Sequence, residues 1–173
     1  MKRIFCFFAL LFAALAAGAQ TRTYTDNASG AFVIGLDDYF YGASGSLNFE
    51  ADGKDIHAAL EENGSVIVNG IVLSKADLGQ WDTIIGTHDF TNNRVPELVV
   101  AKRRDDVQML SIYTLEKGQW KQLGGTISCR GGKEFRIFRQ VISIRRGEVL
   151  CSWTVHNGRL DYKASDGSAE PTL

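Results

Sequence analysis

The sequence predicts a mainly β fold, built as an antiparallel sheet or sandwich, or as a partial propeller-like meander, with one or two short helices. Three observations predict this class. Short runs rich in β-branched and apolar residues recur along the chain. Clusters of Gly, Asn and Asp separate these runs, as in hairpin turns. The connections are only a few residues long, which suits antiparallel pairing.

The N-terminal residues have the three-part pattern of a secretory signal peptide. Lys2 and Arg3 precede an apolar run over residues 4–16, and small residues continue to Ala19. The run is shorter than the roughly 20 residues that a membrane-spanning helix needs. We therefore expect cleavage near Ala19, a secreted or periplasmic location, and no transmembrane segment after cleavage. The predicted organisation is a signal peptide over 1–19, a single β-rich domain over 20–163 and a disordered polar tail over 164–173.

Five segments are predicted to be strands because they are apolar, rich in β-branched residues and bounded by turn residues. They are Ser65–Leu73, Glu97–Lys102, Val107–Glu116, Phe135–Ile144 and Glu148–Val155. Tight turns are expected at Glu116–Gly118 and Arg145–Gly147, where glycine can adopt positive φ. Asn157-Gly158 is the clearest type I′ turn signal, and it predicts a further strand over Arg159–Tyr162.

Two short helices are also predicted. The segment Gly53–Glu62 places three apolar side chains on one helical stripe, and Asp52 precedes it as a candidate N-cap. The segment Lys75–Trp81 follows Ser74, which is a second candidate N-cap.

Two cysteines remain after signal cleavage, Cys129 and Cys151. An oxidising compartment allows such a pair to close, so we expect a disulfide between them. The chain-entropy account gives such a bridge about 3 kcal/mol of stabilisation. The alternatives are a pair of buried free thiols or a catalytic cysteine.

The two halves of the exported chain differ in charge. Residues 20–97 contain 12 acidic and 4 basic side chains, whereas residues 98–173 contain 8 acidic and 13 basic ones. The positive half can attract an anionic partner, and the aromatic rings of Tyr39–Tyr41 can stack on sugars if they are exposed. The alternative for these rings is a place in the core or at a strand edge. The alternative is that the two halves belong to one sheet system and neutralise each other. The candidate binding residues are Arg136, Arg139, Arg145, Arg146, Tyr39 and Tyr41.

The segment His88–Ala101 contains a polar turn followed by an apolar strand. Its residues HDFTNNRVPELVVA resemble the calcium loop and strand of FG-GAP and VCBS-type repeats. This resemblance implies a Ca²⁺ cofactor, although Arg94 stands where the family has glycine. The alternative is a polar turn with no metal. The residues that match the ligand positions are Asp89, Thr91, Asn93 and Glu97.

A fainter copy of this pattern lies 41 residues earlier, at Asn48–Ile56. The offset suits the blade of a propeller, which needs at least four blades of roughly 40 residues. The chain is too short for a complete propeller, so the resemblance covers two strand-loop units.

The function that these patterns predict is a non-catalytic binding domain, exported from the cell, whose partner is a protein surface or an anionic polysaccharide. No nucleic-acid-binding motif is present. None of the three histidines lies in a metalloprotease motif or beside a nucleophile elbow. One alternative is a small secreted hydrolase that uses the polar residues around His88 and Asp89. Another is a secreted inhibitor of an enzyme.

Overall fold

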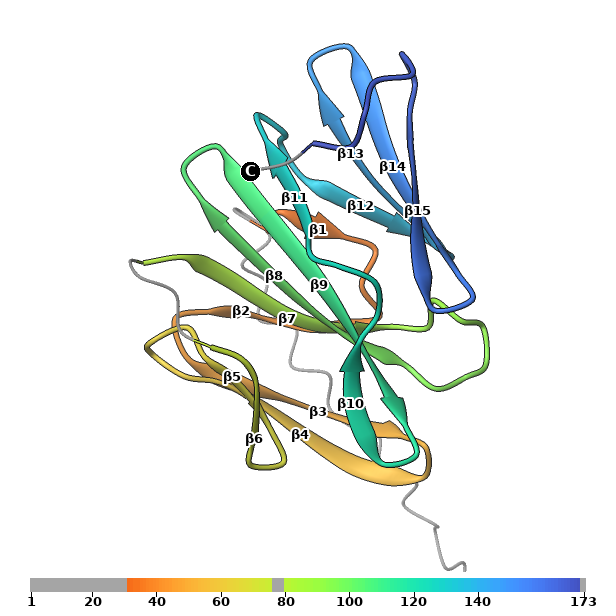
Figure 1. Cartoon of the computed structure of the whole chain (residues 1–173). Coiled ribbons are helices and arrows are strands. Elements are labelled where there is room, and N and C mark those ends of the chain that lie inside the picture. Colours follow the sequence, from red (N-terminus) through yellow and green to blue (C-terminus); the bar gives the residue numbers. More distant parts are fainter. Residues whose placement is uncertain (1–30, 76–79, 172–173) are drawn as a thin grey trace, which may run out of the picture.

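The computed structural model describes residues 31–75 and 80–171, and within these residues every regular element is a β-strand. The strands form three sheets stacked in layers, which we call sheets A, B and C and which are antiparallel except for one strand pair (Figure 1). This architecture confirms the mainly β prediction.

Sheet C is the lower layer in Figure 1 and has the strand order β3-β4-β5-β6. Its strands are β3 (Gly45–Ala51), β4 (Lys54–Leu60), β5 (Val66–Val68) and β6 (Ile71–Ser74).

Sheet B is the middle layer and has the order β10-β9-β8-β7-β2, with β11 also paired to β9. Its strands are β2 (Asp38–Gly42), β7 (Asp82–His88), β8 (Glu97–Arg104), β9 (Val107–Glu116), β10 (Gln119–Gln122) and β11 (Ile127–Arg130).

Sheet A is the upper layer and has the order β1-β12-β13-β14-β15. The pair β1–β12 is parallel and the other pairs are antiparallel. Its strands are β1 (Val33–Ile34), β12 (Phe135–Phe138), β13 (Val141–Arg146), β14 (Val149–His156) and β15 (Arg159–Ala164).

The middle layer packs against both outer layers, so the molecule has two hydrophobic cores. Strand β8 shows the arrangement residue by residue, because successive side chains of a strand point to opposite faces. Leu98 and Val100 lie in the core shared with sheet C, whereas Val99 and Ala101 lie in the core shared with sheet A. The unbroken apolar run of β8 is therefore typical of a strand that is covered on both faces.

Each layer contains a four-stranded meander of consecutive strands, β3–β6, β7–β10 and β12–β15. Tight turns with two residues at positive φ join several of these strands. Asn157 and Gly158 have φ of 49° and 73°, and Lys117 and Gly118 have φ of 51° and 77°. These turns lie where the glycine-containing turns were predicted.

The predicted helix over Gly53–Glu62 is wrong, because β4 occupies this segment. Asp52 and Gly53 have φ of 53° and 67°, so they form the β3–β4 hairpin turn rather than a helix start. The apolar residues Ile56, Ala58 and Leu60 occupy alternate positions of β4 and are buried in the core between sheets B and C. The alternation of buried and exposed residues, with a period of two, therefore determines that this segment is a strand.

Two predicted strands are hairpins. Ser65–Leu73 divides into β5 and β6 at Asn69-Gly70, which have φ of 46° and 82°. Phe135–Ile144 divides into β12 and β13, with Arg139 at φ 55° in the turn. Asn69-Gly70 is a type I′ signal that the sequence already contains.

Some predictions fall on residues that the structure does not describe. The signal peptide over 1–19 lies outside the described ranges, and so does most of the predicted helix Lys75–Trp81. Among the described residues, none belongs to a helix long and apolar enough to cross a membrane.

The segment after β15 packs back against sheet A. There, Nε1 of Trp153 donates a hydrogen bond to Oε1 of Glu170 at 2.6 Å.

The predicted disulfide is also wrong, because Cys129 and Cys151 are free thiols in this structure. Both side chains are buried in the core between sheets A and B. Each sulfur has its own contact: Sγ of Cys129 lies 3.8 Å from the carbonyl oxygen of Arg130, and Sγ of Cys151 accepts a hydrogen bond from the Tyr162 hydroxyl at 3.5 Å. The thiols thus behave as small core side chains, which is the alternative considered from the sequence.

Candidate binding surface

The loop between β7 and β8 uses its acidic side chains to hold its own backbone. Oδ1 of Asp89 accepts a hydrogen bond from the amide of Asn93 at 3.1 Å, and Oδ2 accepts one from the amide of Arg94 at 2.8 Å. Oδ1 of Asn93 accepts a hydrogen bond from the amide of Val95 at 2.7 Å. These bonds stabilise a turn in which Asn92 and Arg94 have positive φ, at 56° and 67°.

Glu97 holds the other side of the same loop. Its side chain is 1% exposed, with Oε2 accepting from the amide of Phe90 at 2.8 Å and Oε1 from the hydroxyl of Thr91 at 3.1 Å. Burial raises the pKa of Glu97, and the two hydrogen bonds partly oppose this. Phe90 is itself fully buried, so Glu97 fixes an anchor of the loop in the core.

This arrangement bears on the four candidate metal ligands, which do lie in one loop. Oxygens of Asp89, Asn93 and Glu97 face N–H donors of the loop, whereas a Ca²⁺ site needs six to eight oxygens directed at a common point. Within residues 31–75 and 80–171, no group of three or more His, Cys, Asp or Glu side chains is close enough to hold a metal ion. The geometry thus favours the structural turn over a calcium loop.

The fainter copy of the motif has a different structure. Asn48 lies in the middle of β3, and its Oδ1 is 2.7 Å from Nδ1 of His57 on the paired strand β4. The turn there is the two-residue Asp52-Gly53 hairpin rather than a long polar loop.

His88 is a structural link and not a free imidazole. Nε2 donates to the carbonyl oxygen of Arg139 at 2.8 Å, and Nδ1 lies 3.3 Å from Oδ2 of Asp37. The ring packs edge-to-face on Phe90 at 4.7 Å. Since the Asp89 carboxylate binds its own loop, His88 and Asp89 do not converge as a hydrolytic pair.

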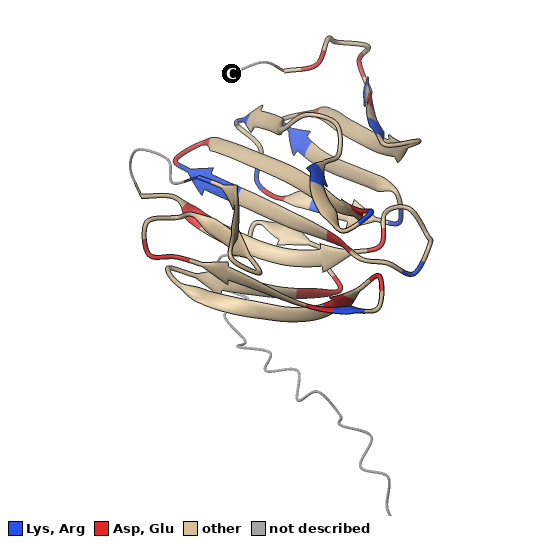
Figure 2. Cartoon of the chain, turned by 60° about the horizontal axis from the view of Figure 1, so that its bottom comes forward, with Lys and Arg blue, Asp and Glu red and all other residues tan. Residues whose placement is uncertain are grey.

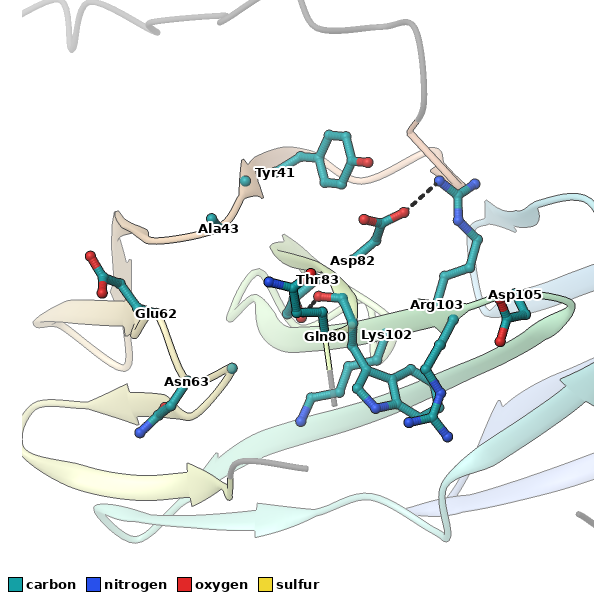
Figure 3. A pocket seen from close by; sticks show the side chains of 14 residues that line it. Tyr41, Ala43, Glu62, Asn63, Gln80, Asp82, Thr83, Lys102, Arg103 and Asp105 are labelled. Atoms are coloured by element: carbon teal, nitrogen blue, oxygen red, sulfur yellow. Dashed lines mark hydrogen bonds and ion pairs between the residues drawn. The ribbon is translucent and has the colours of Figure 1, made fainter. Parts of the chain in front are cut away.

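A hollow of about 700 Å³ opens between the start of β7, the end of β8 and the loop after β4 (Figure 3). Its cations have structural contacts. Nη2 of Arg103 pairs with Oδ2 of Asp82 at 2.9 Å, and the guanidinium of Arg104 lies 4.5 Å from the ring centre of Trp81. Nζ of Lys102 donates to the carbonyl of Lys75 at 3.1 Å. Acidic and basic groups alternate around this hollow, so its electrostatics select no ligand class.

Tyr39 and Tyr41, which were predicted to bind sugars, lie on β2 at the margin of the core between sheets A and B. Both rings are half-buried, and Tyr41 packs edge-to-face on Phe32 at 6.3 Å. Tyr41 also lines the hollow of Figure 3. The two tyrosines do not join the arginines in one surface.

The four candidate arginines have three different placements. Arg136 and Arg145 are exposed on the outer face of sheet A, and both line a shallow depression of about 460 Å³. Arg139 lies in the β12–β13 turn, with its guanidinium 5.3 Å from the ring centre of Phe138. Arg146 points the other way, and its Nε donates to the carbonyl of Arg130 at 2.9 Å. Adjacent strand residues such as Arg145 and Arg146 point to opposite faces.

The outer face of sheet A combines this positive charge with exposed apolar side chains. Phe138 is 71% exposed, Ile34 46% and Leu150 40%. The strand register places Arg136 beside Ile34, and Arg145 beside Leu150. The charged residues at outward strand positions are four basic and one acidic: Arg136, Arg145, Arg159, Lys163 and Asp161.

The apolar members of this surface were not predicted, although the sequence contains the signal for them. In β12 the residues alternate between buried and exposed, so Phe138 has the same outward orientation as Arg136. A large aromatic at an outward position of an alternating strand is the feature that could have identified the surface.

These features define a three-layer, all-β domain that carries a basic and apolar sheet face. No family model, curated protein or solved structure matches this chain.

Proposed function

We propose that this chain is an exported, non-catalytic interaction module that binds an acidic protein surface through the outer face of sheet A. The observation that carries the proposal is the combination of a largely exposed Phe138 with two arginines on the outer face of sheet A: Arg145, and Arg136, whose guanidinium pairs with Glu134 at the rim of the same depression. Aromatic and arginine side chains are the residue types enriched at protein interfaces. The location rests on the N-terminal pattern of residues 1–19.

A protein surface fits this face better than a polysaccharide does. Ile34 and Leu150 add exposed aliphatic groups beside the arginines, and these gain more from burial against apolar side chains than against hydroxylated sugar rings. Phe138, the exposed aromatic residue of this face, has the Arg139 guanidinium 5.3 Å from its ring centre. The guanidinium therefore covers a ring face on which a sugar could stack.

Catalysis has less support. The nitrogens of His88 face Arg139 and Asp37, and the Asp89 carboxylate binds two backbone amides of its own loop. A hydrolase needs a base that can reach a nucleophile or a water in a pocket. An enzyme inhibitor remains within the proposed class, since inhibition by contact is also binding to a protein surface.

The test measures binding to an immobilised peptide of alternating Glu and Leu, with a Lys and Leu peptide for comparison. The double variant Arg136→Glu and Arg145→Glu should weaken binding to the acidic peptide at least tenfold. The matched control is Lys117→Glu with Lys121→Glu, which makes the same charge change at the β9–β10 hairpin, away from this face. Binding to heparin in place of the acidic peptide would favour the polysaccharide, and equal binding by both double variants would refute the proposed surface.

A further inference from the structure

The outer face of sheet C has the opposite character to that of sheet A. Its outward acidic strand residues are Glu50 and Asp55, both exposed; no Lys or Arg occupies an outward position on its strands, and the outward His57 lies with Nδ1 2.7 Å from Oδ1 of Asn48. In Figure 2 the strands of sheet C carry red segments beside their connecting turn, whereas blue segments lie mainly in the other layers.

The two carboxylates of this face are direct cross-strand neighbours, because Glu50 pairs with Asp55 in the β3–β4 register. Like charges that face each other across two strands destabilise the pair. Asp52 adds a third acidic side chain in the turn between them. Lys54 belongs to the same hairpin but pairs with the buried Ala51, so its strand position faces sheet B. A cationic group above the outer face would complement Glu50 and Asp55 from the other side.

The face of sheet C also has an apolar part. The register places Ala59, Ile67 and Val72 in one outward row across β4, β5 and β6. Of these three, Val72 is 52% exposed. An acidic end and an apolar end on one sheet face complement the basic and apolar groups on the outer face of sheet A.

We infer that the acidic surface bound by sheet A is the outer face of sheet C of a second copy of this chain. This inference rests on the proposed function and identifies its partner. Sheets A and C lie on opposite sides of sheet B, so they cannot meet within one molecule. Copies stacked in the same orientation along the layer direction would set the outer face of sheet A, with Arg136 and Arg145, against the outer face of sheet C, with Glu50 and Asp55.

Such a contact is head-to-tail, because each copy contributes a different face. Each added copy leaves one basic and one acidic face available, so the assembly grows as a stack of sheets unless its rotation closes a ring. The same three-layer packing that holds the chain together is thereby continued between copies.

The expected contact is weak and sensitive to salt. A face four strands wide, with strands about 4.8 Å apart, and about six residues long, with a rise of about 3.3 Å per residue, measures roughly 20 by 20 Å. Each copy would therefore bury about 400 Å². The total, about 800 Å², lies below the size of a standard stable interface. Charge pairs at such a rim are screened as salt rises from about 0.05 to about 0.5 M.

Sedimentation velocity over a range of protein concentrations tests the inference with two double variants. Variant one, Arg136→Glu with Arg145→Glu, removes the basic face. Variant two, Glu50→Lys with Asp55→Lys, removes the acidic face. Each should be monomeric alone at concentrations where the wild type associates. Variant two should be no less stable to urea than the wild type, because a cross-strand pair of two negative charges is replaced by a cross-strand pair of two positive charges.

Mixing the variants gives the decisive result. Variant one presents two acidic faces and variant two presents two basic faces, so every contact between sheet A of one variant and sheet C of the other pairs opposite charges. An equimolar mixture should therefore associate again, with the two variants alternating along the stack. A symmetric dimer that uses one face twice would instead lose association in only one variant. A wild type that stays monomeric in low salt but still binds the Glu and Leu peptide would overturn this inference and leave the proposed function standing. A wild type that neither associates nor binds the Glu and Leu peptide would overturn both this inference and the proposed function.

Discussion

The imidazole Nε2 of His88 lies 2.8 Å from the backbone carbonyl oxygen of Arg139, 51 residues away in the sequence. His88 ends β7 in the middle layer, and Arg139 forms the turn between β12 and β13 in the upper layer. The hydrogen bond therefore joins two sheets at the end of their shared core.

Replacing His88 by Phe tests this link. The aromatic contact with Phe90 is retained in form, while the N–H donor is lost, so the free energy of unfolding should fall by about 1 kcal/mol. Urea unfolding measures the change. His156→Phe is the control, because His156 is exposed on β14 and should shift stability by less than about 0.5 kcal/mol. Equal effects of the two changes would contradict the link.

Gly35 is placed where no other residue fits. It has φ of 95°, and a Cβ there would lie 2.1 Å from the backbone carbonyl oxygen of Ile137. Because backbone cannot move aside as a flexible side chain does, Gly35→Ala should destabilise the protein by about 2 kcal/mol or more. Thermal or urea unfolding measures this. Gly125→Ala is the control, since nothing lies within 4 Å of its added Cβ; a harmless Gly35→Ala would refute the close approach of β1 to β12.

Glu97 gives a prediction for the dependence of stability on pH. Burial raises its folded pKa above the ordinary value of 4.5, so the folded state holds this proton more tightly than the unfolded state does. Stability from this group is therefore fully present below pH 4.5 and is lost as pH rises through the folded pKa. In Glu97→Gln, which keeps an acceptor for the Phe90 amide, this loss should vanish.

The measurement is urea unfolding of both proteins at several pH values from about 4 to about 7. The wild type should lose stability relative to Glu97→Gln as pH rises. A constant difference between the two proteins would show that the Glu97 carboxyl titrates alike in the folded and unfolded states.

The cysteines give a chemical prediction. Burial, with the neighbouring Cys151 adding to it, raises the pKa of the Cys129 thiol to about 11 despite the nearby Arg146. At pH 8 only about one in a thousand such thiols is ionised, so native Cys129 should react very slowly with a disulfide reagent. Protein that starts at Gln20 and therefore lacks Cys6, purified without reductant, should react with two equivalents of the reagent in denaturant, one at each thiol. No reaction would indicate a bridge between Cys129 and Cys151.

Much of the fold could be predicted because strand periodicity and turn chemistry are local signals. Val107–Glu116 was predicted with the bounds that β9 has, and the Asn157-Gly158 turn lies where expected. The segment over Gly53–Glu62 was missed because Ile56, Ala59 and Leu60 also fit a helical stripe. Packing against the middle layer selects the strand, and this tertiary effect is not visible in local spacing.

The candidate site was predictable only in part. Arg136 and Arg145 are outward residues of alternating strands, whereas Arg146 points inward by the same alternation. Phe138 follows Arg136 at the next outward position of β12, whereas Ile34 becomes a neighbour of Arg136 only through the β1–β12 pairing. Such long-range register cannot be read from a single chain segment.

The middle layer also determines how the protein unfolds. Strand β8 is hydrogen-bonded on both edges, to β7 and β9, and its side chains belong to both cores. Its amide protons should reach solvent only when the whole molecule opens, so hydrogen exchange should be slowest at Leu98–Ala101. Each core takes one of its walls from the β7–β9 meander, so this meander must be formed before either core is complete.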